Sequence, residues 1–316
     1  MEALAVILEG PERLALKQLE LCAPQAFDVL VETAFSGISG GTEKLLWNGQ
    51  MPEFPGMGYP LVPGYESVGR IVDAGPDATD RVGDWVFVPG ANCYTEARGL
   101  FGGTSQRLVV PSSRAMPVSE SLKEAGVLFA LAATALHAIN GGPNQQTTPP
   151  ELIIGHGVLG RLLARITIAL GAPAPTVWET QASRRNGSQG YNVIAPDQDE
   201  RRDYTSIYDA SGDADLIDAL IPRLAKGGEI TLAGFYSKRL GFDFAPAFMA
   251  EARLRIAAEW QPQDLAQTSD LIETGQLDLS GLVSDRRPAD EATSAYPHAF
   301  GDPDCLKMVL DWRGCA

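Results

Sequence analysis

The first third of the chain consists of short apolar segments separated by glycine and proline. These segments are rich in β-branched residues, and turn-forming residues bound each of them, which is typical of β-strands. The pattern therefore predicts a β-rich domain at the N-terminal end. Its predicted strands are residues 3–9, 14–20, 28–35, 67–74, 85–89 and 106–111.

The pattern changes after residue 119. Over residues 120–139, apolar side chains such as Ala125, Leu128 and Leu136 recur near helical spacing. Beyond a loop rich in Gly and Pro, apolar strands alternate with helical segments, which is typical of a doubly wound parallel sheet. The predicted strands are 152–154, 176–179, 191–194, 206–209 and 229–233, and the predicted helices are 161–170, 214–224 (stopped by 225–228) and 264–274.

The first strand of this alternating region runs into a glycine turn of the form GxGxxG. Gly155 permits the tight turn, Gly157 lets the backbone approach a pyrophosphate, and Gly160 lets helix and strand pack closely. The helix that begins around Val158 and Leu159 offers free N–H groups to phosphates. Strand, turn and helix together predict a dinucleotide-binding site.

The end of the next predicted strand decides which dinucleotide binds. Glu179 lies there, about 20 residues past the last glycine, where a carboxylate accepts hydrogen bonds from the ribose 2′-OH and repels a 2′-phosphate. Arg184 and Arg185 follow closely, and arginines in this region can also hold a 2′-phosphate or belong to a solvated turn. The carboxylate favours NAD over NADP.

Length, charge and cysteine content limit which partners and which cellular location we expect. The chain has 316 residues, enough for two domains, and a net charge of −15, which disfavours nucleic acid as a partner. The four cysteines show no CxxC spacing, the N-terminus has no basic signal-like region, and no apolar stretch approaches membrane-spanning length. We therefore expect a cytoplasmic protein with reduced thiols, and leave a homodimer and proximity to a membrane surface open.

A β-rich domain followed by a Rossmann domain resembles the medium-chain dehydrogenase/reductase superfamily over nearly the whole chain. Residues 64–69 (GYESVG) resemble its GHExxG motif, residues 81–86 (RVGDWV) its RVGDxV strand, and residues 209–212 and 224–229 its later Rossmann signatures. The resemblance implies an α/β protein with a GroES-like catalytic domain (1–119 and the returning tail 263–316) and a Rossmann domain (120–262). It also implies that Thr134, Ala210 and Gly234 lie near the cofactor.

Zinc-dependent members of that superfamily hold the catalytic metal with three residues that this chain lacks. Ser39 stands in place of the Cys after Gly-Ile, Tyr65 in place of the His, and Ala130 near the third ligand position. These side chains cannot build the tetrahedral N/S site that zinc requires. The structural zinc lobe has only Cys93, so the sequence predicts no protein-bound zinc.

Without the metal, hydrogen bonds and a general base must activate the substrate hydroxyl. Tyr65 stands where the metal-binding His would stand, so its phenol would face the reacting oxygen, unless it only packs. Lys44 could lower the pKa of that tyrosine or carry a proton outward. For Glu66 we favour a role as a buried structural carboxylate. The candidate catalytic residues are Ser39, Thr42, Lys44 and Tyr65, with Glu43 and Glu66 beside them.

The remaining candidates for acid–base chemistry are three histidines. His137 follows Thr134 by one helical turn, and we interpret it as a satisfied core residue rather than a catalyst. His156 occupies a variable position of the glycine turn. His298 lies in the weakly patterned tail and carries no visible motif.

The loop 45–63 is unusually apolar and contains four prolines, which exclude a regular helix or strand interior. It either packs against the rest of the chain or a second copy, or it forms a wall for a large, flat, apolar substrate. The candidate substrate-binding residues are Trp47, Phe54, Met57 and Tyr59.

Residues 36–47 and 51–66 closely resemble the bacteriochlorophyllide a dehydrogenase family of photosynthetic bacteria, with support from residues 155–165, 177–179 and 304–312. The resemblance implies NAD-dependent oxidation of the 1-hydroxyethyl group at C3 of a magnesium chlorin to an acetyl group. A zinc-free quinone or enone reductase remains an alternative, although these generally use NADPH. A pigment carrier without enzymatic activity is a second alternative.

Overall fold

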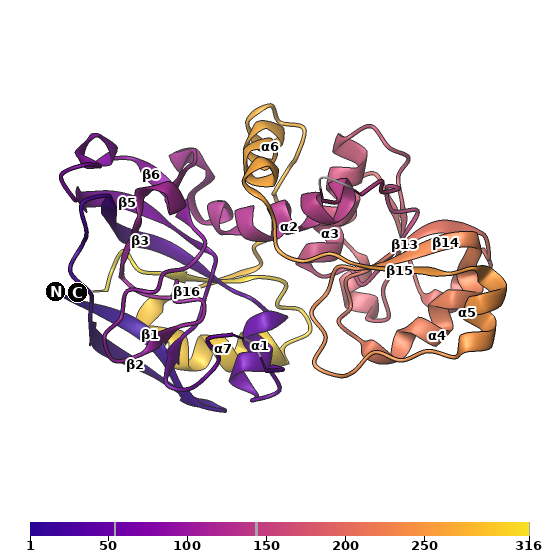
Figure 1. Cartoon of the computed structure of the whole chain (residues 1–316), viewed down its shortest axis with the longest axis horizontal. Coiled ribbons are helices and arrows are strands. Elements are labelled where there is room, and N and C mark those ends of the chain that lie inside the picture. The colour runs from indigo at the N-terminus through magenta and orange to yellow at the C-terminus, as the bar shows by residue number, and fades with distance from the viewer. Residues whose placement is uncertain (54, 143–144, 316) are drawn as a thin grey trace. The chain divides into compact units, whose positions relative to one another are not determined.

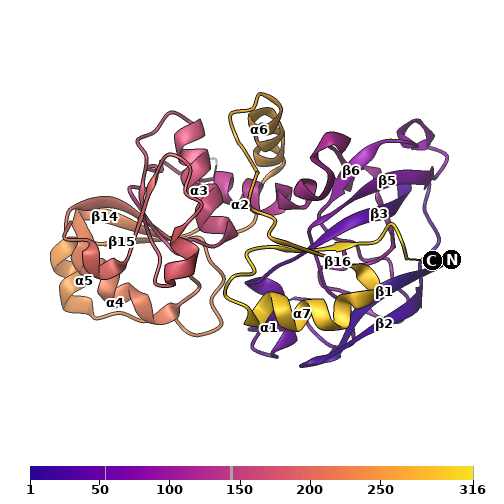
Figure 2. The same ribbon diagram turned by 180° about the vertical axis from the view of Figure 1, so that it is seen from behind.

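The computed structural model describes residues 1–53, 55–142 and 145–315. The chain forms two compact units, one made of Met1–Ala130 with Ser280–Ala316 and the other of Leu131–Leu279. Figures 1 and 2 show the elements of each unit from opposite sides. Since each unit has its own sheets and core, each is described by itself.

The first unit is built of two sheets. Its N-terminal strands are β1 (Glu2–Gly10), β2 (Arg13–Glu20), β3 (Asp28–Ile38), β4 (Leu61–Val62), β5 (Ser67–Ala74), β6 (Trp85–Val88), β7 (Arg98–Gly99), β8 (Arg107–Pro111) and β9 (Met116–Pro117). A four-stranded sheet has the order β2-β1-β4-β7, and β3, β5, β6, β8 and β9 belong to a seven-stranded sheet. The six strands predicted in this part of the chain are all present, and the prediction missed β4, β7 and β9, which have two residues each.

The C-terminal tail completes the first unit. It contains β16 (Asp285–Pro288), α7 (Ala292–Gly301) and β17 (Met308–Asp311). β17 pairs antiparallel with β3, from Met308 opposite Ile38 to Asp311 opposite Phe35. In Figure 1 the yellow tail accordingly lies among the indigo strands. The short helix α1 (Thr42–Trp47), which follows β3, therefore lies beside residues from the far end of the chain.

The second unit is a parallel six-stranded sheet with helices. Its strands are β10 (Leu152–Ile154), β11 (Thr176–Trp178), β12 (Asn192–Ile194), β13 (Tyr204–Asp209), β14 (Leu224–Leu232) and β15 (Arg253–Ile256). Its helices are α2 (Phe129–Asn140, which begins in the first unit), α3 (Val158–Ala169), α4 (Ile217–Leu220), α5 (Phe244–Ala250) and α6 (Pro262–Glu273). The strand order β12-β11-β10-β13-β14-β15 is that of the dinucleotide-binding Rossmann fold.

The helix predicted at 214–224 and its stop differ in the structure. The helix expected at 214–224 is broken into short pieces, with Pro222 in a final 3₁₀ turn, because proline lacks the N–H that continues a helix. Residues 225–228 do not stop a helix as predicted, since they lie within β14. That strand begins where Leu224 pairs with Tyr204, and its register shifts before Glu229.

The unit boundaries also differ from the predicted 119/120 and 262/263. Residues 120–130 stay with the first unit, where the Phe129 ring stacks on Phe87 at 6.0 Å. Helix α6 stays with the second unit because Asp264 bonds His137 of α2 at 2.8 Å. The tail therefore returns at Ser280, not at Gln263.

The long helix expected at 120–139 is a 3₁₀ segment (Glu120–Leu128) followed by α2. Together they form, within the described part of the chain, one stretch long and apolar enough to cross a membrane by length and composition. The expectation that no apolar stretch approaches membrane-spanning length is therefore wrong. Leu128, Ala132 and Leu136 are fully buried, as in a core helix.

Candidate active site

Ser39 and Tyr65 form a hydroxyl pair in the first unit. Ser39 lies just after β3 and Tyr65 just before β5, and the neighbouring strands bring them together. The two side-chain oxygens are 2.7 Å apart, and the Thr42 hydroxyl also hydrogen-bonds the phenol. Burial, followed by the charge of Glu66, raises the Tyr65 pKa well above its usual value. The phenol therefore stays protonated near neutral pH and can donate a hydrogen bond.

Glu43 is a fully buried carboxyl on α1. Its Oε1 accepts a hydrogen bond from the Ser39 backbone N–H at 2.9 Å, and its Oε2 accepts one from the Tyr296 hydroxyl at 2.8 Å. Burial raises the Glu43 pKa to about 7, although both hydrogen bonds act to lower it. The carboxyl thus changes charge near neutral pH beside the hydroxyl pair.

Glu66 forms a buried ion pair with Lys307 from the tail. The Lys307 Nζ lies 2.7 Å from Oε2 and 2.9 Å from Oε1, and it also donates to the Ile38 carbonyl at 3.2 Å. Gly37 is required here because a Cβ would lie 2.2 Å from Oε2. Glu66 is therefore structural, as the sequence interpretation favoured.

The Lys44 side chain contacts the tail. The Lys44 ammonium donates to the Phe300 carbonyl at 3.0 Å, and its side chain is exposed. The Tyr65 pKa is raised rather than lowered, so the lowered tyrosine pKa suggested for Lys44 is not found, while outward proton transfer by Lys44 stays a prediction. A flexible side chain at the surface of α1 finds a partner on α7, which the sequence could not indicate.

The residues at the former metal positions do not fit zinc. Ser39 and Tyr65 hydrogen-bond each other, and Ala130 is fully buried with no ligand atom in its side chain. The nearby carboxylates of Glu43 and Glu66 already accept hydrogen bonds from other groups. In the described ranges, no group of three metal-ligand side chains occurs here.

The apolar loop packs against its own unit. Trp47, Met57 and Tyr59 are partly buried against a cluster of buried residues: Leu8, Leu46, Leu61 and Leu100. Trp47 also contacts Phe300, with ring centroids 6.3 Å apart. Packing within the chain thus accounts for one face of the loop, and its partly exposed atoms stay available to a ligand. Phe54 lies outside the described residues.

The glycine turn of the second unit has the features of a pyrophosphate site. Gly155 adopts φ +94°, and a Cβ at Gly160 would lie 1.9 Å from the Gly155 carbonyl oxygen. The space around a Cβ at Gly157 is open. Val158 starts α3 and Leu159 follows it, so their N–H groups lie in the first turn of the helix.

Ala210 and Gly234 follow the carboxyl ends of β13 and β14, next to the glycine turn. The Ala210 N–H donates to the Ile154 carbonyl at 3.0 Å, and the Gly234 N–H donates to the Asp209 carbonyl at 3.0 Å. Ligands of doubly wound sheets bind at this edge, where the strand order reverses between β10 and β13. Thr134 lies on α2 in the same unit.

Glu179 lies at the end of β11 and is nearly buried. Its Oε2 accepts from the His156 backbone N–H at 3.0 Å, and its Oε1 accepts from the Gln181 N–H at 2.8 Å. The Arg185 guanidinium donates to the carbonyls of Glu179 and Thr180, at 2.8 and 3.0 Å. The carboxylate is thus held beside the turn, while Arg185 is engaged with the backbone.

The histidines of the second unit are structural. His137 bonds Asp264, which satisfies it as predicted. The His156 Nδ1–H donates to the Arg184 carbonyl at 2.6 Å, and Nε2 accepts from the Tyr191 hydroxyl at 2.9 Å. Burial lowers the His156 pKa to about 4, so this neutral tautomer holds the loop that follows Glu179.

Sequence reasoning missed Tyr296 and Lys307, which supply the partners of Glu43 and Glu66. Both residues lie in the weakly patterned tail, more than 240 positions from their partners. A buried carboxylate needs a hydrogen-bond donor or a cation as its partner. Burial of Glu66 therefore implies that a partner exists, but the sequence does not indicate which residue it is.

The chain is similar in sequence and in fold to known dehydrogenases. Residues 25–120 match the alcohol dehydrogenase GroES-like domain. The chain is 59% identical, over the whole of both chains, to the 2-desacetyl-2-hydroxyethyl bacteriochlorophyllide A dehydrogenase of Cereibacter sphaeroides, and 57% identical to that of Rhodobacter capsulatus over 99% of each. It also resembles acetophenone reductase from Geotrichum candidum in complex with NAD (TM-score 0.82, 19% identity, 98% of this chain and 97% of that one).

The GroES-like unit and the Rossmann unit define a medium-chain dehydrogenase of the alcohol dehydrogenase type. Within that class, the chain belongs to the family of 2-desacetyl-2-hydroxyethyl bacteriochlorophyllide A dehydrogenases.

Proposed function

We propose that this protein oxidises the 1-hydroxyethyl group of a bacteriochlorophyllide to an acetyl group with NAD and without a catalytic zinc. The names of its full-length relatives support the substrate and the reaction. The observation that carries the zinc-free chemistry is the Ser39–Tyr65 pair, 2.7 Å apart, where zinc-dependent relatives hold a metal. Such a pair can bind the oxygen of a secondary alcohol.

Ser39 and Tyr65 take over the orienting role of the metal. Their hydroxyls hold the substrate oxygen. The hydroxyl proton of the alcohol passes to water as the hydride leaves the carbinol carbon, and the protonated phenol stabilises the negative charge that develops on the oxygen. Thr42 fixes the phenol from its other side. Glu43 sets the local charge, because its carboxyl raises the Tyr65 pKa when it is ionised.

The cofactor is NAD, held by the second unit. Gly155, Gly157 and the N–H groups at the start of α3 receive the pyrophosphate, and Glu179 receives the adenosine ribose. When bound, the oxidised nicotinamide supplies the acceptor for the hydride that leaves the carbinol carbon. The engagement of Arg185 with backbone carbonyls supports NAD over NADP.

The loop that carries Trp47, Met57 and Tyr59 forms part of the surface for the flat macrocycle. These side chains are only partly buried, so atoms beyond their packed face can contact an apolar ligand. Four free thiols support a cytoplasmic location.

The second unit forms a dimer through its edge strand. β15 pairs with β14 on one side only, and Ile256, Phe248 and Met249 are each at least 66% exposed. An open strand edge beside an apolar surface is typical of an interface. Size-exclusion chromatography with light scattering would give twice the chain mass, and Ile256→Asp would give the monomer.

Incubation of the purified protein with hydroxyethyl bacteriochlorophyllide tests the activity. We expect the pigment absorption to shift to that of the acetyl product in the presence of NAD, with one NADH formed per pigment. Parallel reactions contain NADP, or a quinone with NADPH. Pigment binding without turnover indicates a carrier, and turnover of the quinone alone indicates a reductase; either result contradicts the proposal.

A further inference from the structure

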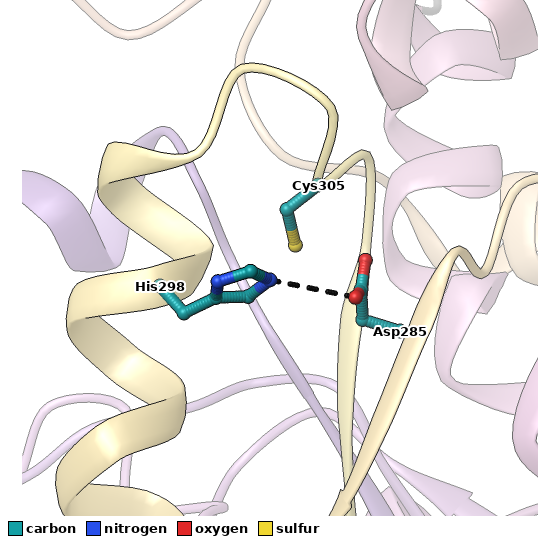
Figure 3. Close-up of side chains that lie close together, drawn as sticks. All are labelled: Asp285, His298 and Cys305. Atoms are coloured by element: carbon teal, nitrogen blue, oxygen red, sulfur yellow. Dashed lines mark ion pairs between the residues drawn. The ribbon is translucent and has the colours of Figure 1, made fainter.

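Three metal-ligand side chains converge in the returning tail. Asp285 comes from β16, His298 from α7, and Cys305 from the loop before β17, and Figure 3 shows them turned toward one another. The Asp285 oxygen, the His298 nitrogen and the Cys305 Sγ all lie within 4.8 Å of one another. Three elements of the tail thus point their ligand atoms at one place.

Two of the three ligands face a further side chain. Ser284 Oγ donates to Asp285 Oδ2 at 2.6 Å, which leaves Oδ1 facing His298 Nε2 at 3.5 Å. The opposite ring nitrogen, Nδ1, faces Asp302 Oδ2 at 3.7 Å. A histidine that binds metal through one nitrogen commonly donates from the other to a carboxylate.

The loop that carries Cys305 is fixed at both ends. The N–H groups of Leu306 and Lys307 donate to Ser284 Oγ, at 2.8 and 3.2 Å, and the Cys305 N–H donates to the Asp302 carbonyl at 3.2 Å. The ligand atoms therefore come from a framework that backbone hydrogen bonds hold in place. Because His298 and Asp285 are partly exposed, solvent can reach the site.

The types of the three ligand atoms and the distances between them indicate which metal ion the site would bind. In tetrahedral zinc sites, bond lengths near 2.0–2.3 Å place neighbouring ligand atoms about 3.3–3.6 Å apart. The distance of 3.5 Å between Asp285 Oδ1 and His298 Nε2 already matches this spacing. The Cys305 sulfur needs to move by about 1 Å at most to reach it. A thiolate, an imidazole and one carboxylate suit Zn²⁺ better than the oxygen-binding Mg²⁺ or Ca²⁺.

We propose that Asp285, His298 and Cys305 form a zinc-binding site, with water as the fourth ligand, separate from the hydroxyl pair. The ion ties together β16, α7 and the loop that leads to β17. It also fixes the segment that carries Lys307, two residues from Cys305. Zinc here stabilises the returning tail and takes no part in alcohol oxidation.

A catalytic cysteine triad fits the same side chains less well. In such triads the imidazole stands between the thiol and the carboxylate, and the thiol is ionised. Here burial, followed by the hydrogen bond to Asp285, raises the pKa of the Cys305 thiol to about 12. The thiol is a poor nucleophile but becomes a ligand when a cation displaces its proton.

The sequence prediction of no protein-bound zinc considered only the two zinc sites of the superfamily. The ligands found here are 13 and 7 positions apart along the chain, without the short Cys spacing of zinc motifs. Total metal content alone therefore cannot decide between the absence of a catalytic zinc and the presence of this site.

Metal titration of the full-length protein tests the proposal. The chelator-stripped protein is titrated with Zn²⁺ against a chromophoric competitor, and separately with Co²⁺, whose spectrum reports thiolate bonding and four-coordination. We expect one site per chain with a thiolate-to-Co²⁺ charge-transfer band. His298→Gln and Cys305→Ser should weaken zinc binding more than about 100-fold, and the outer-shell change Asp302→Asn about tenfold.

Cys315→Ser is the matched control, since this thiol lies in the same tail outside the cluster. It should keep the affinity and the cobalt spectrum. His298 is partly exposed, so His298→Gln tests the site even if Cys305→Ser disturbs folding. Equal zinc affinity in wild type and His298→Gln, or a cobalt spectrum without the charge-transfer band, would overturn the proposal.

Discussion

The Lys307 ammonium lies 2.7 Å from Glu66 Oε2, although 241 positions separate the two residues in the chain. Both side chains are almost completely buried. The pair joins the tail to the motif that carries Tyr65, so the geometry beside the hydroxyl pair depends on the tail being in place. Burial raises the pKa of the Glu66 carboxyl, and the Lys307 cation acts against that rise.

Removing only the cation should destabilise the protein strongly. We expect Lys307→Met to lower the free energy of unfolding by about 3–5 kcal/mol, because Glu66 is then buried without its partner. The double variant Lys307→Met/Glu66→Gln should recover at least half of that loss, since no charge remains to be desolvated. Urea unfolding at neutral pH measures both values. Additive losses in the double variant would show that the two residues do not act as a pair.

Glu43 should make stability depend on pH in an unusual direction. Its pKa is about 7 in the folded protein against an ordinary 4.5, so between these values the folded state binds the extra proton. Stability from this group is therefore fully present below pH 4.5 and is lost as pH rises to about 7, by about 3 kcal/mol.

Glu43→Gln removes this titration. The amide oxygen still accepts from the Ser39 N–H, and the Tyr296 hydroxyl can turn to accept from the new NH₂. We expect the variant to lose about 2–3 kcal/mol less stability than the wild type between pH 5 and pH 8, measured by urea unfolding at each pH. Glu200→Gln, at an exposed position, serves as the control. Parallel stability curves for Glu43→Gln and wild type would contradict the assignment.

The sequence predicted the local parts of this fold well. The glycine turn and the strand at 152–154 depend on neighbouring residues only, so the pattern identified them. The helix at 264–274 is present too, but its packing on α2 through Asp264 determines the unit to which it belongs. Its membership therefore could not be derived from periodicity.

The site was predictable in part, for the same physical reason. Ser39 and Tyr65 follow from motif positions on adjacent strands, and the structure brings them together. The direction of the Lys44 side chain and the partners Tyr296 and Lys307 depend on where the tail returns. That return is set by β17 pairing with β3, a non-local contact that leaves no periodic signal.

Tyr65→Phe tests the phenol as the hydrogen-bond donor to the reacting oxygen. We expect kcat to fall about 100-fold, since the donor is lost while the ring and its edge-to-face contact with Phe101 remain. Tyr94→Phe is the control, because that buried phenol donates to the Gly102 carbonyl. Kinetics with the hydroxyethyl pigment, and thermal unfolding to verify the fold, supply the measurement. An unchanged kcat would remove Tyr65 from the mechanism.

Glu179→Gln tests the basis of the NAD preference. The substitution keeps the shape of the side chain but removes the charge that repels a 2′-phosphate and strengthens the hydrogen bonds to the ribose. A hydrogen bond to a charged group contributes about 1.5–3 kcal/mol, so the ratio of kcat/KM for NAD over NADP should fall about 10- to 100-fold. Arg185→Ala should leave that ratio near the wild-type value, because its guanidinium is engaged with the carbonyls of Glu179 and Thr180. If instead Arg185→Ala changed the ratio and Glu179→Gln did not, the arginine rather than the carboxylate would govern the choice of cofactor.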